Sequence, residues 1–100
     1  MNDDDRLLKA RLDGSRAASL LNDETLQGAF TALKRAYAEK LLATSVNETA
    51  ARETLYQAHR LVGEIENHLI SVLNNGKLAE AELQHLIRMS EPAKQWHTVQ

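Results

Sequence analysis

The residues of this sequence best suited to chemistry are a few glutamates and histidines at helical spacing. Glu82 and His85 are three residues apart, the Glu-x-x-His spacing that carboxylate-bridged di-iron bundles take from two of their four helices. A complete site needs a second such pair and two further glutamates, and the nearest candidates are Glu39, Glu64 and His68. Glu64 and His68 are four residues apart and do not provide the second Glu-x-x-His pair. We therefore interpret Glu82 and His85 as part of a helical salt bridge and predict no metal and no cofactor. A metal-dependent bundle stays an alternative, which elemental analysis would detect.

Other catalytic motifs do not occur. Ser19 and Ser71 lack the Gly-x-Ser-x-Gly context of a nucleophile elbow, and Gly76-Lys77 lacks the preceding glycine and following hydroxyl of a P-loop. His59, beside the apolar stripe of a predicted helix, is expected to be structural. Without cysteine, the chain has no disulfide, thiolate zinc site or cysteine nucleophile. We predict that the protein is not an enzyme.

The composition indicates an all-α protein with one small helical domain over residues 1–92. Hydrophobic residues make up 43% of the 100 residues but aromatic residues only 4%, and Pro92 is the only proline. A core of leucine and alanine between helices fits these values. A formal net charge of −2 provides no long-range field for nucleic acid or anionic lipid. The acidic start and the lack of a long apolar run predict neither a signal peptide nor a membrane span.

The element that must position any functional surface is a long helix predicted over residues 46–75. Ser45 and Glu48 have the spacing of a capping box at its start, and Asn75-Gly76 is suited to close it. Between them, apolar residues recur at alternating three- and four-residue steps, as in a helix that lies along another helix. This apolar stripe consists of Leu55, Ala58, Val62, Ile65, Leu69 and Val72.

A second amphipathic helix is predicted over residues 23–43, with Asn22-Asp23 as its start signal. Its apolar residues have four-three-four spacing: Leu26, Phe30, Leu33 and Tyr37. The small side chains of Ala29 and Ala36 would permit close approach of the long helix. Because the connection through residues 43–45 is short, we expect the two helices to form an antiparallel hairpin.

Shorter helices are predicted at each end. Over residues 3–21, Leu8, Leu12, Ala18 and Leu21 could line one face, but Gly14-Ser15 predicts a bent or broken helix. From Leu78 to Met89 a short helix follows, ended by Ser90-Glu91-Pro92. Residues 93–100 lack periodicity and are predicted to be a mobile tail, in which Trp96 either docks back or inserts into a partner.

Partner binding is the function that the pattern favours. Leu61, Ile70 and Leu73 lie outside the strict stripe and make the apolar band of the long helix wider than two helices require. We take these three residues, with Trp96, as candidates for partner binding and expect the hairpin to close its core by self-association, as a dimer or a ring. An aspartate at Val62 or Ile65 should abolish folding, whereas Ile70→Asp should dissociate copies and leave the helices intact.

Nucleic-acid binding is the main alternative. Residues 5–42 can be interpreted as a helix-turn-helix, but the second helix would begin with Asp23-Glu24, which repels phosphate. Basic residues also occur in the first helix, among several aspartates: Arg6, Lys9, Arg11 and Arg16. A DNA-packaging adaptor would use these four side chains, and a gel shift that depends on salt would detect it.

A resemblance can be stated for about residues 18–84. It rests on Leu21-Asn22-Asp23-Glu24-Thr25-Leu26, Ala29-Phe30-Thr31-Ala32-Leu33, Ala51-Arg52-Glu53-Thr54-Leu55, His68-Leu69 and Asn75-Gly76-Lys77-Leu78-Ala79. These runs resemble small uncharacterised helical proteins encoded among the virion-morphogenesis genes of tailed bacteriophages and prophages. The resemblance implies a phage origin, a location in the host cytoplasm or the virion, and a part in packaging, connector assembly or DNA delivery. It transfers no functional residue. Small terminase subunits are a neighbouring family, from which the acidic start of the second helix departs.

Overall fold

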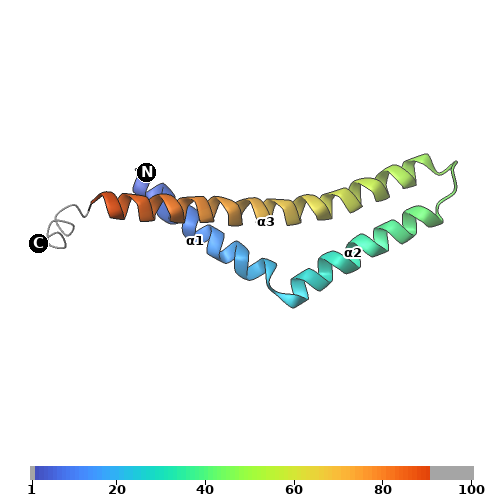
Figure 1. Ribbon diagram of the computed structural model, residues 1–100. Helices are drawn as coiled ribbons and strands as arrows, with labels where there is room; N and C mark the ends of the chain where they lie inside the picture. Colours follow the sequence, from blue (N-terminus) through green and yellow to red (C-terminus); the bar gives the residue numbers. More distant parts are fainter. Residues whose placement is uncertain (1, 91–100) are drawn as a thin grey trace, which may run out of the picture. The chain divides into compact units, whose positions relative to one another are not determined.

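The computed structural model of the protein describes residues 2–90, which form three α-helices and no strand (Figure 1). Helix α1 spans Asp3–Leu21, α2 spans Glu24–Ala43 and α3 spans Thr49–Met89. The long helix α3 packs against the two shorter helices, and the predicted all-α class is confirmed. The predicted tail over residues 93–100, including Trp96, lies outside the described residues.

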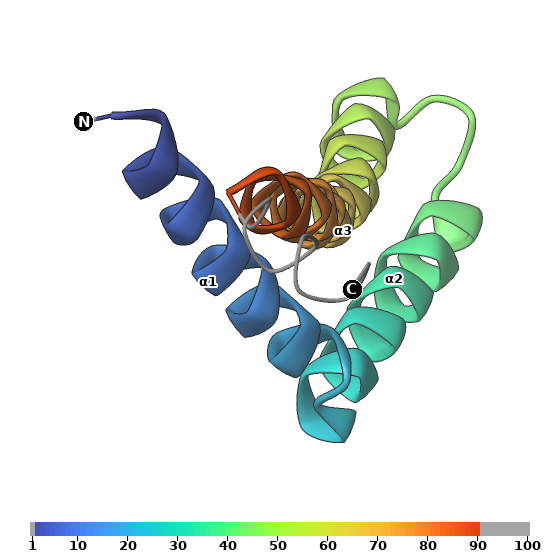
Figure 2. The same cartoon turned by 60° about the vertical axis from the view of Figure 1, so that its left-hand side comes forward.

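The chain divides into two compact units, and α1 and α3 contribute to both. One unit combines the residues up to Ala17 with those from Val72 onward, and we call it the glycine unit. In Figures 1 and 2 it contains most of the blue helix α1 and the orange part of α3. The other unit, Ala18–Ser71, contains α2 and the first part of α3, and we call it the hairpin unit. The single domain predicted over residues 1–92 stays a prediction.

The boundaries of α2 agree with the sequence. The carboxylate of Asp23 accepts a hydrogen bond from the Leu26 amide at 2.8 Å, which caps the first turn. At the other end, the amide and the hydroxyl of Thr44 both donate to the Leu41 carbonyl, at 3.2 and 2.6 Å. Arg52 Nη1 donates to Thr44 Oγ1 at 3.0 Å, so the end of α2 is tied directly to the first turns of α3.

The predicted capping box does not start the long helix at residue 46. The Glu48 amide instead donates to the Ser45 carbonyl at 3.1 Å, which makes residues 45–48 a turn. The Glu48 carbonyl then accepts the first helical hydrogen bond, from the Arg52 amide at 3.0 Å. Helix α3 therefore begins at Thr49 and the connection is longer than the sequence suggested.

Two glycines overturn the predicted helix boundaries. Gly14 lies inside a continuous α1 and Gly76 inside a continuous α3, so the predicted break, the predicted stop and the separate helix from Leu78 are all wrong. No glycine in the described residues has a positive φ. A Cβ atom built on Gly14 would lie 2.7 Å from the Gly76 Cα, and a Cβ atom on Gly76 would lie 2.7 Å from the Gly14 Cα. The two glycines are thus the point where the backbones of α1 and α3 touch.

Small residues around this crossing form the core of the glycine unit. Ala17 and Ala79 have only 3% and 4% of their surface exposed, and Leu7 of the same unit is also buried. The face predicted from Leu8 and Leu12 is wrong, because both side chains are exposed. The buried side of α1 instead carries Leu7, Gly14 and Ala17, and at Gly14 the lack of a side chain lets the two helix backbones come close.

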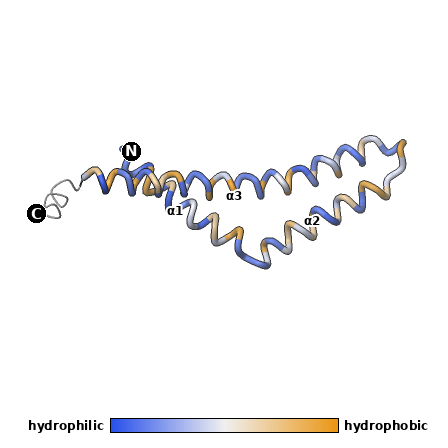
Figure 3. Tube along the Cα trace, viewed as in Figure 1, coloured by the Kyte–Doolittle hydropathy of each residue, from blue (hydrophilic) through white to orange (hydrophobic). Residues whose placement is uncertain are grey.

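Polar and apolar residues alternate along all three helices (Figure 3). No helix in the described part of the chain is long and apolar enough to cross a membrane.

Candidate functional site

The glutamates and histidines considered for metal binding lie on exposed positions of α2 and α3. Within residues 2–90, no three histidine, aspartate or glutamate side chains come close enough to hold a metal ion. Glu64 accepts a hydrogen bond from Arg60 Nε at 3.1 Å, one turn earlier on the same helix. These side chains therefore have the arrangement of a charged helix surface. The exposed set is Glu39, His59, Glu64, His68, Glu82 and His85.

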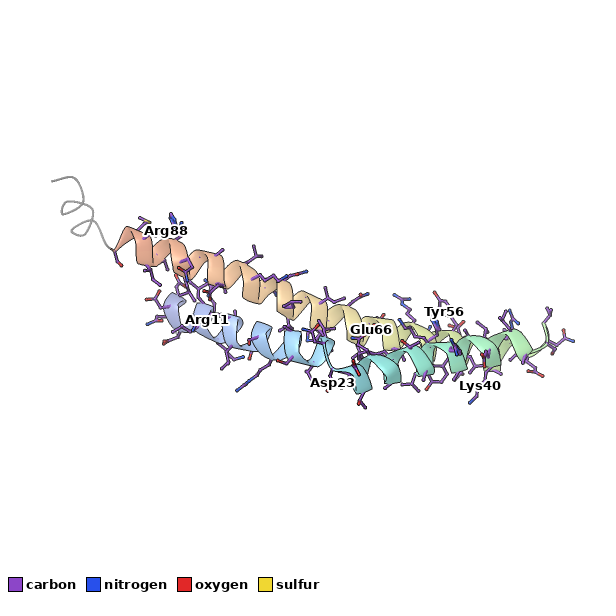
Figure 4. The ribbon with its side chains drawn as sticks, turned by 60° about the horizontal axis from the view of Figure 1, so that its bottom comes forward. Arg11, Asp23, Lys40, Tyr56, Glu66 and Arg88 are labelled. Atoms are coloured by element: carbon purple, nitrogen blue, oxygen red, sulfur yellow. The ribbon has the colours of Figure 1, made fainter. Side chains whose placement is uncertain are left out.

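Three of the four basic residues considered for DNA binding form ion pairs. Arg6 lies 3.3 Å from Asp3 and Lys9 lies 2.6 Å from Asp13, both within α1. Arg11 reaches across to α3, where its Nη1 lies 3.4 Å from Glu80 Oε2. Figure 4 shows Arg11 on α1 next to the C-terminal part of α3. Arg16, the fourth, is exposed. These carboxylates offset much of the positive charge that phosphate recognition would need.

Glu80 is the acidic partner in this contact, and its pKa is lowered. The largest cause is a hydrogen bond from Gln84 Nε2 to Glu80 Oε1 at 3.0 Å. Desolvation opposes the shift, and the charge and the hydrogen bond of Arg11 add to it. All these groups lie at the surface of the glycine unit, so the interaction is screened by solvent.

We expect the stability of the glycine unit to depend weakly on pH through Glu80. Because the pKa of Glu80 is lower in the folded than in the unfolded chain, its stabilising effect is complete above the unfolded pKa and is lost as the pH falls through the folded pKa. Gln84→Ala should raise the pKa of Glu80, which an NMR titration of the side-chain carboxyl carbon measures. An unchanged titration curve in Gln84→Ala would contradict this account.

The hairpin unit contains a partly buried ion pair between α2 and α3. Lys34 Nζ lies 2.8 Å from Glu66 Oε1, and the two side chains are 38% and 19% exposed. This oxygen is buried and, among the described residues, accepts no hydrogen bond of good geometry. The ammonium of Lys34 nevertheless stabilises this carboxylate at 2.8 Å, because the Coulomb attraction does not need an aligned N–H. Figure 4 shows Glu66 on the side of α3 that faces α2.

Removing the lysine of this pair should cost more than removing both charges. We expect Lys34→Met to lower the free energy of unfolding by about 1–2 kcal/mol, because it leaves a buried carboxylate without a counter-charge. The double variant Lys34→Met/Glu66→Gln should recover at least half of that loss. Urea denaturation of the two single variants and the double variant gives the coupling energy. Strictly additive losses would show that the pair contributes nothing.

Beside this ion pair, the hairpin unit exposes large apolar side chains. Phe30 of α2 and Val62 of α3 are buried, each 7% exposed. By contrast, Leu61 is 56%, Ile65 is 48% and Leu33 is 44% exposed. The prediction that Ile65 and Leu33 pack inside the hairpin is wrong. Leu33 directly precedes Lys34, and Ile65 directly precedes Glu66. The ion pair therefore occupies the position between α2 and α3 that the sequence suggested for Leu33 and Ile65.

Leu61 and Ile70, two of the predicted partner-binding residues, do not share one face of α3. Leu61 and Ile70 are both exposed on α3, at 56% and 43%. They are nine residues apart, which at about 100° per residue places them on opposite sides of the helix. Leu73 is half-buried in the glycine unit, and Trp96 lies outside the described residues. Ile65 and Leu33 were not identified as surface residues from the sequence. The oppositely charged residues that follow them, Glu66 and Lys34, could have indicated an ion pair between the helices.

Each unit also has a shallow depression. In the hairpin unit it has a volume of about 290 Å³ and lies where α2 ends and α3 begins. Its lining mixes polar and apolar side chains: Leu41, Val46, Thr49, Arg52, Glu53 and Tyr56. In the glycine unit a depression of about 310 Å³ is lined mainly by leucine and isoleucine from α1 and α3: Asp4, Leu8, Leu83, Leu86, Ile87 and Ser90. The depression of the glycine unit is thus mainly apolar, whereas that of the hairpin unit is mixed.

Comparison with known proteins assigns the chain to no family: no protein-family model, curated protein or solved structure matches it.

Proposed function

We propose that the protein is a non-enzymatic structural or assembly protein that acts as a homo-oligomer. One observation carries this proposal. Leu33, Leu61 and Ile65 expose about half of their surface directly beside the buried Phe30 and Val62. Two helices have only one contact face between them, so the rest of a wide apolar band stays in water until another surface covers it.

Burial over the whole described chain supports the same conclusion. The buried hydrophobic residues of residues 2–90 are Leu7, Ala17, Phe30, Val62 and Ala79, and none has less than 2% of its surface exposed. Small domains are marginally stable because they bury little of their surface. Association with further copies would bury the apolar residues that a single copy leaves in water.

The proposed building block is an antiparallel hairpin of α2 and the first part of α3. Two contacts support this orientation. Thr44 and Arg52 meet next to the connection, and Lys34 and Glu66 meet farther from it. The contact with the lower residue number on α2 has the higher residue number on α3. Contacts follow this order in an antiparallel pair.

The proposed setting is the assembly or DNA packaging of a bacteriophage virion, which rests on the sequence resemblance described above. The partners would be further copies and, in the particle, another structural protein. A DNA-packaging role through the basic residues of α1 is less favoured, because Arg6, Lys9 and Arg11 already pair with carboxylates.

Light scattering coupled to size-exclusion chromatography tests the proposal on the full chain. We expect a mass that is a multiple of the chain mass and that falls toward one chain on dilution. A mass of one chain at every concentration would contradict the proposal. A DNA gel shift at low salt, run on the same sample, tests the packaging alternative.

A further inference from the structure

One side of α3 in the hairpin unit carries no charged side chain. At about 100° per residue, seven residues between 54 and 69 share this side, and we call it the uncharged face. Arg52, Glu53, Arg60, Glu64 and Glu66 all lie elsewhere around the helix. The uncharged face consists of Thr54, Gln57, Ala58, Leu61, Ile65, His68 and Leu69.

This face is largely exposed, although its composition suits burial. Its two largest aliphatic side chains, Leu61 and Ile65, are 56% and 48% exposed. A helix surface that faces water normally carries charged groups, because they are hydrated favourably. Four turns without a charge are therefore expected of a surface that another molecule covers.

Helix α2 widens the same surface. Leu33 and Ile65 directly precede Lys34 and Glu66, which contact each other at 2.8 Å. In an antiparallel pair of helices, the two residues that precede a pair of contacting residues lie on the same side of the pair. Leu33, which is 44% exposed, then lies next to Ile65, and the exposed Ala29 follows one turn away. The apolar surface is two helices wide, as each half of a four-helix bundle requires.

We propose that the uncharged face of α3 binds the uncharged face of a second copy of this chain, with the two α3 helices antiparallel. The two α2 helices then meet through Leu33 and complete a four-helix bundle. This inference rests on the proposed self-association and names its surface and its orientation.

The charges at the edge of the uncharged face favour an antiparallel second copy of the chain as its binding partner. Arg60 and Glu64 are one turn apart on one edge, and Arg60 Nε already lies 3.1 Å from Glu64 Oε1 within the helix. An antiparallel second copy places its own Glu64 near Arg60 and its own Arg60 near Glu64, so opposite charges meet twice. In a parallel pair related by a two-fold axis, the same edge of the two copies falls on opposite sides of the interface, so Arg60 and Glu64 of one copy would not meet those of the other. The edge is thus complementary to itself in the antiparallel orientation alone.

Ile65→Asp tests the face, with Ile70→Asp as its matched control. Both replace an isoleucine of similar exposure on the same helix, but Ile70 lies five residues on, about 140° around the helix from Ile65. We expect Ile65→Asp to raise the dissociation constant of the dimer about 100-fold, because the new carboxylate would be buried unpaired. In contrast to the expectation from the sequence, which gave Ile70→Asp the dissociating role, this control should change the dissociation constant less than about threefold, since an exposed carboxylate stays hydrated. Circular dichroism should show that both variants stay helical.

A charge swap between copies tests the orientation. Arg60→Glu gives one copy two negative side chains at the edge, and Glu64→Arg gives a copy two positive ones. Each variant alone should dimerise about tenfold more weakly than the natural chain, because like charges face each other. An equimolar mixture should recover the natural affinity by forming the mixed dimer, which native mass spectrometry identifies by its mass. The clash within each helix is the same in the mixture, so only contacts between copies explain a rescue.

The possible results distinguish the proposed interface from the proposed self-association. A natural chain that is monomeric at all concentrations overturns both. A natural chain that associates while Ile65→Asp associates equally well overturns the uncharged face as the interface. Loss of association in Ile65→Asp without rescue in the charge-swap mixture overturns the antiparallel orientation.

Discussion

Gly14→Ala is expected to lower the free energy of unfolding by about 2 kcal/mol, although alanine is the better helix former. The added Cβ atom would lie 2.7 Å from the Gly76 Cα and 3.2 Å from the Val72 carbonyl oxygen. Both are backbone atoms of α3, which cannot turn aside as a flexible side chain can. The helices must therefore separate, and the small-residue contact around Ala17 and Ala79 loosens. Gly76→Ala should have an effect of the same size, because its Cβ atom would lie 2.7 Å from the Gly14 Cα.

Two other glycines provide the matched control. Gly28 in α2 and Gly63 in α3 also lie inside helices, but a Cβ atom on either has no neighbour within 4 Å. There alanine should raise the free energy of unfolding by up to about 1 kcal/mol, because it restricts the unfolded chain and favours the helix. The same substitution is thus expected to have opposite signs at the two pairs of sites.

Urea denaturation followed by circular dichroism measures all four variants, at one protein concentration because association adds to stability. If Gly14→Ala and Gly76→Ala stabilise the protein as much as Gly28→Ala does, α1 and α3 do not meet at these glycines. An intermediate result, with a loss at only one of the two sites, would also contradict a contact in which the glycines face each other.

Val62→Asp is expected to remove the cooperative unfolding of the hairpin unit. Val62 is 7% exposed, like Phe30 in the same unit, and a carboxylate at this position would be buried without a counter-charge. The expected loss is about 4 kcal/mol or more, which is most of the stability of a typical small domain. Thermal unfolding followed by circular dichroism should then show a broad, non-cooperative change.

Ile65→Asp serves as the control for this result. Ile65 is three residues away in the same predicted stripe, but it is 48% exposed. Its carboxylate stays hydrated in a single copy, so the variant should keep its helical signal and a cooperative transition. If Val62→Asp unfolds no more readily than Ile65→Asp, the assignment of Val62 to the interior of the hairpin is wrong.

Local signals in the sequence were sufficient for some of the structure. The all-α class followed from composition, and α2 followed from the Asp23 cap and the spacing of its apolar residues. Phe30 and Val62 were placed in the interface between α2 and α3, and both are buried. These features depend on neighbours within one or two helical turns, which is the range over which side-chain spacing and capping act.

Only the tertiary structure determined which face of α3 contacts α2. Periodicity gave Val62 and Ile65 equal weight, because both fit the apolar stripe. The structure turns α3 so that Glu66 contacts Lys34 of α2, and Ile65 is left half-exposed. A contact between two helices depends on residues of both, and spacing along a single helix cannot select among adjacent faces.

What the sequence by itself determined was therefore the helical class, the start and end of α2, and an apolar band on α3 that is wider than its buried part. Only the tertiary structure decided that Gly14 and Gly76 lie inside helices. A glycine within a helix costs about 1 kcal/mol locally, so each was interpreted as a boundary. The two glycines are separated by more than sixty residues, and their close packing against each other offsets the local cost. That gain exists only when both helices are present, which is why no pattern along the chain revealed it.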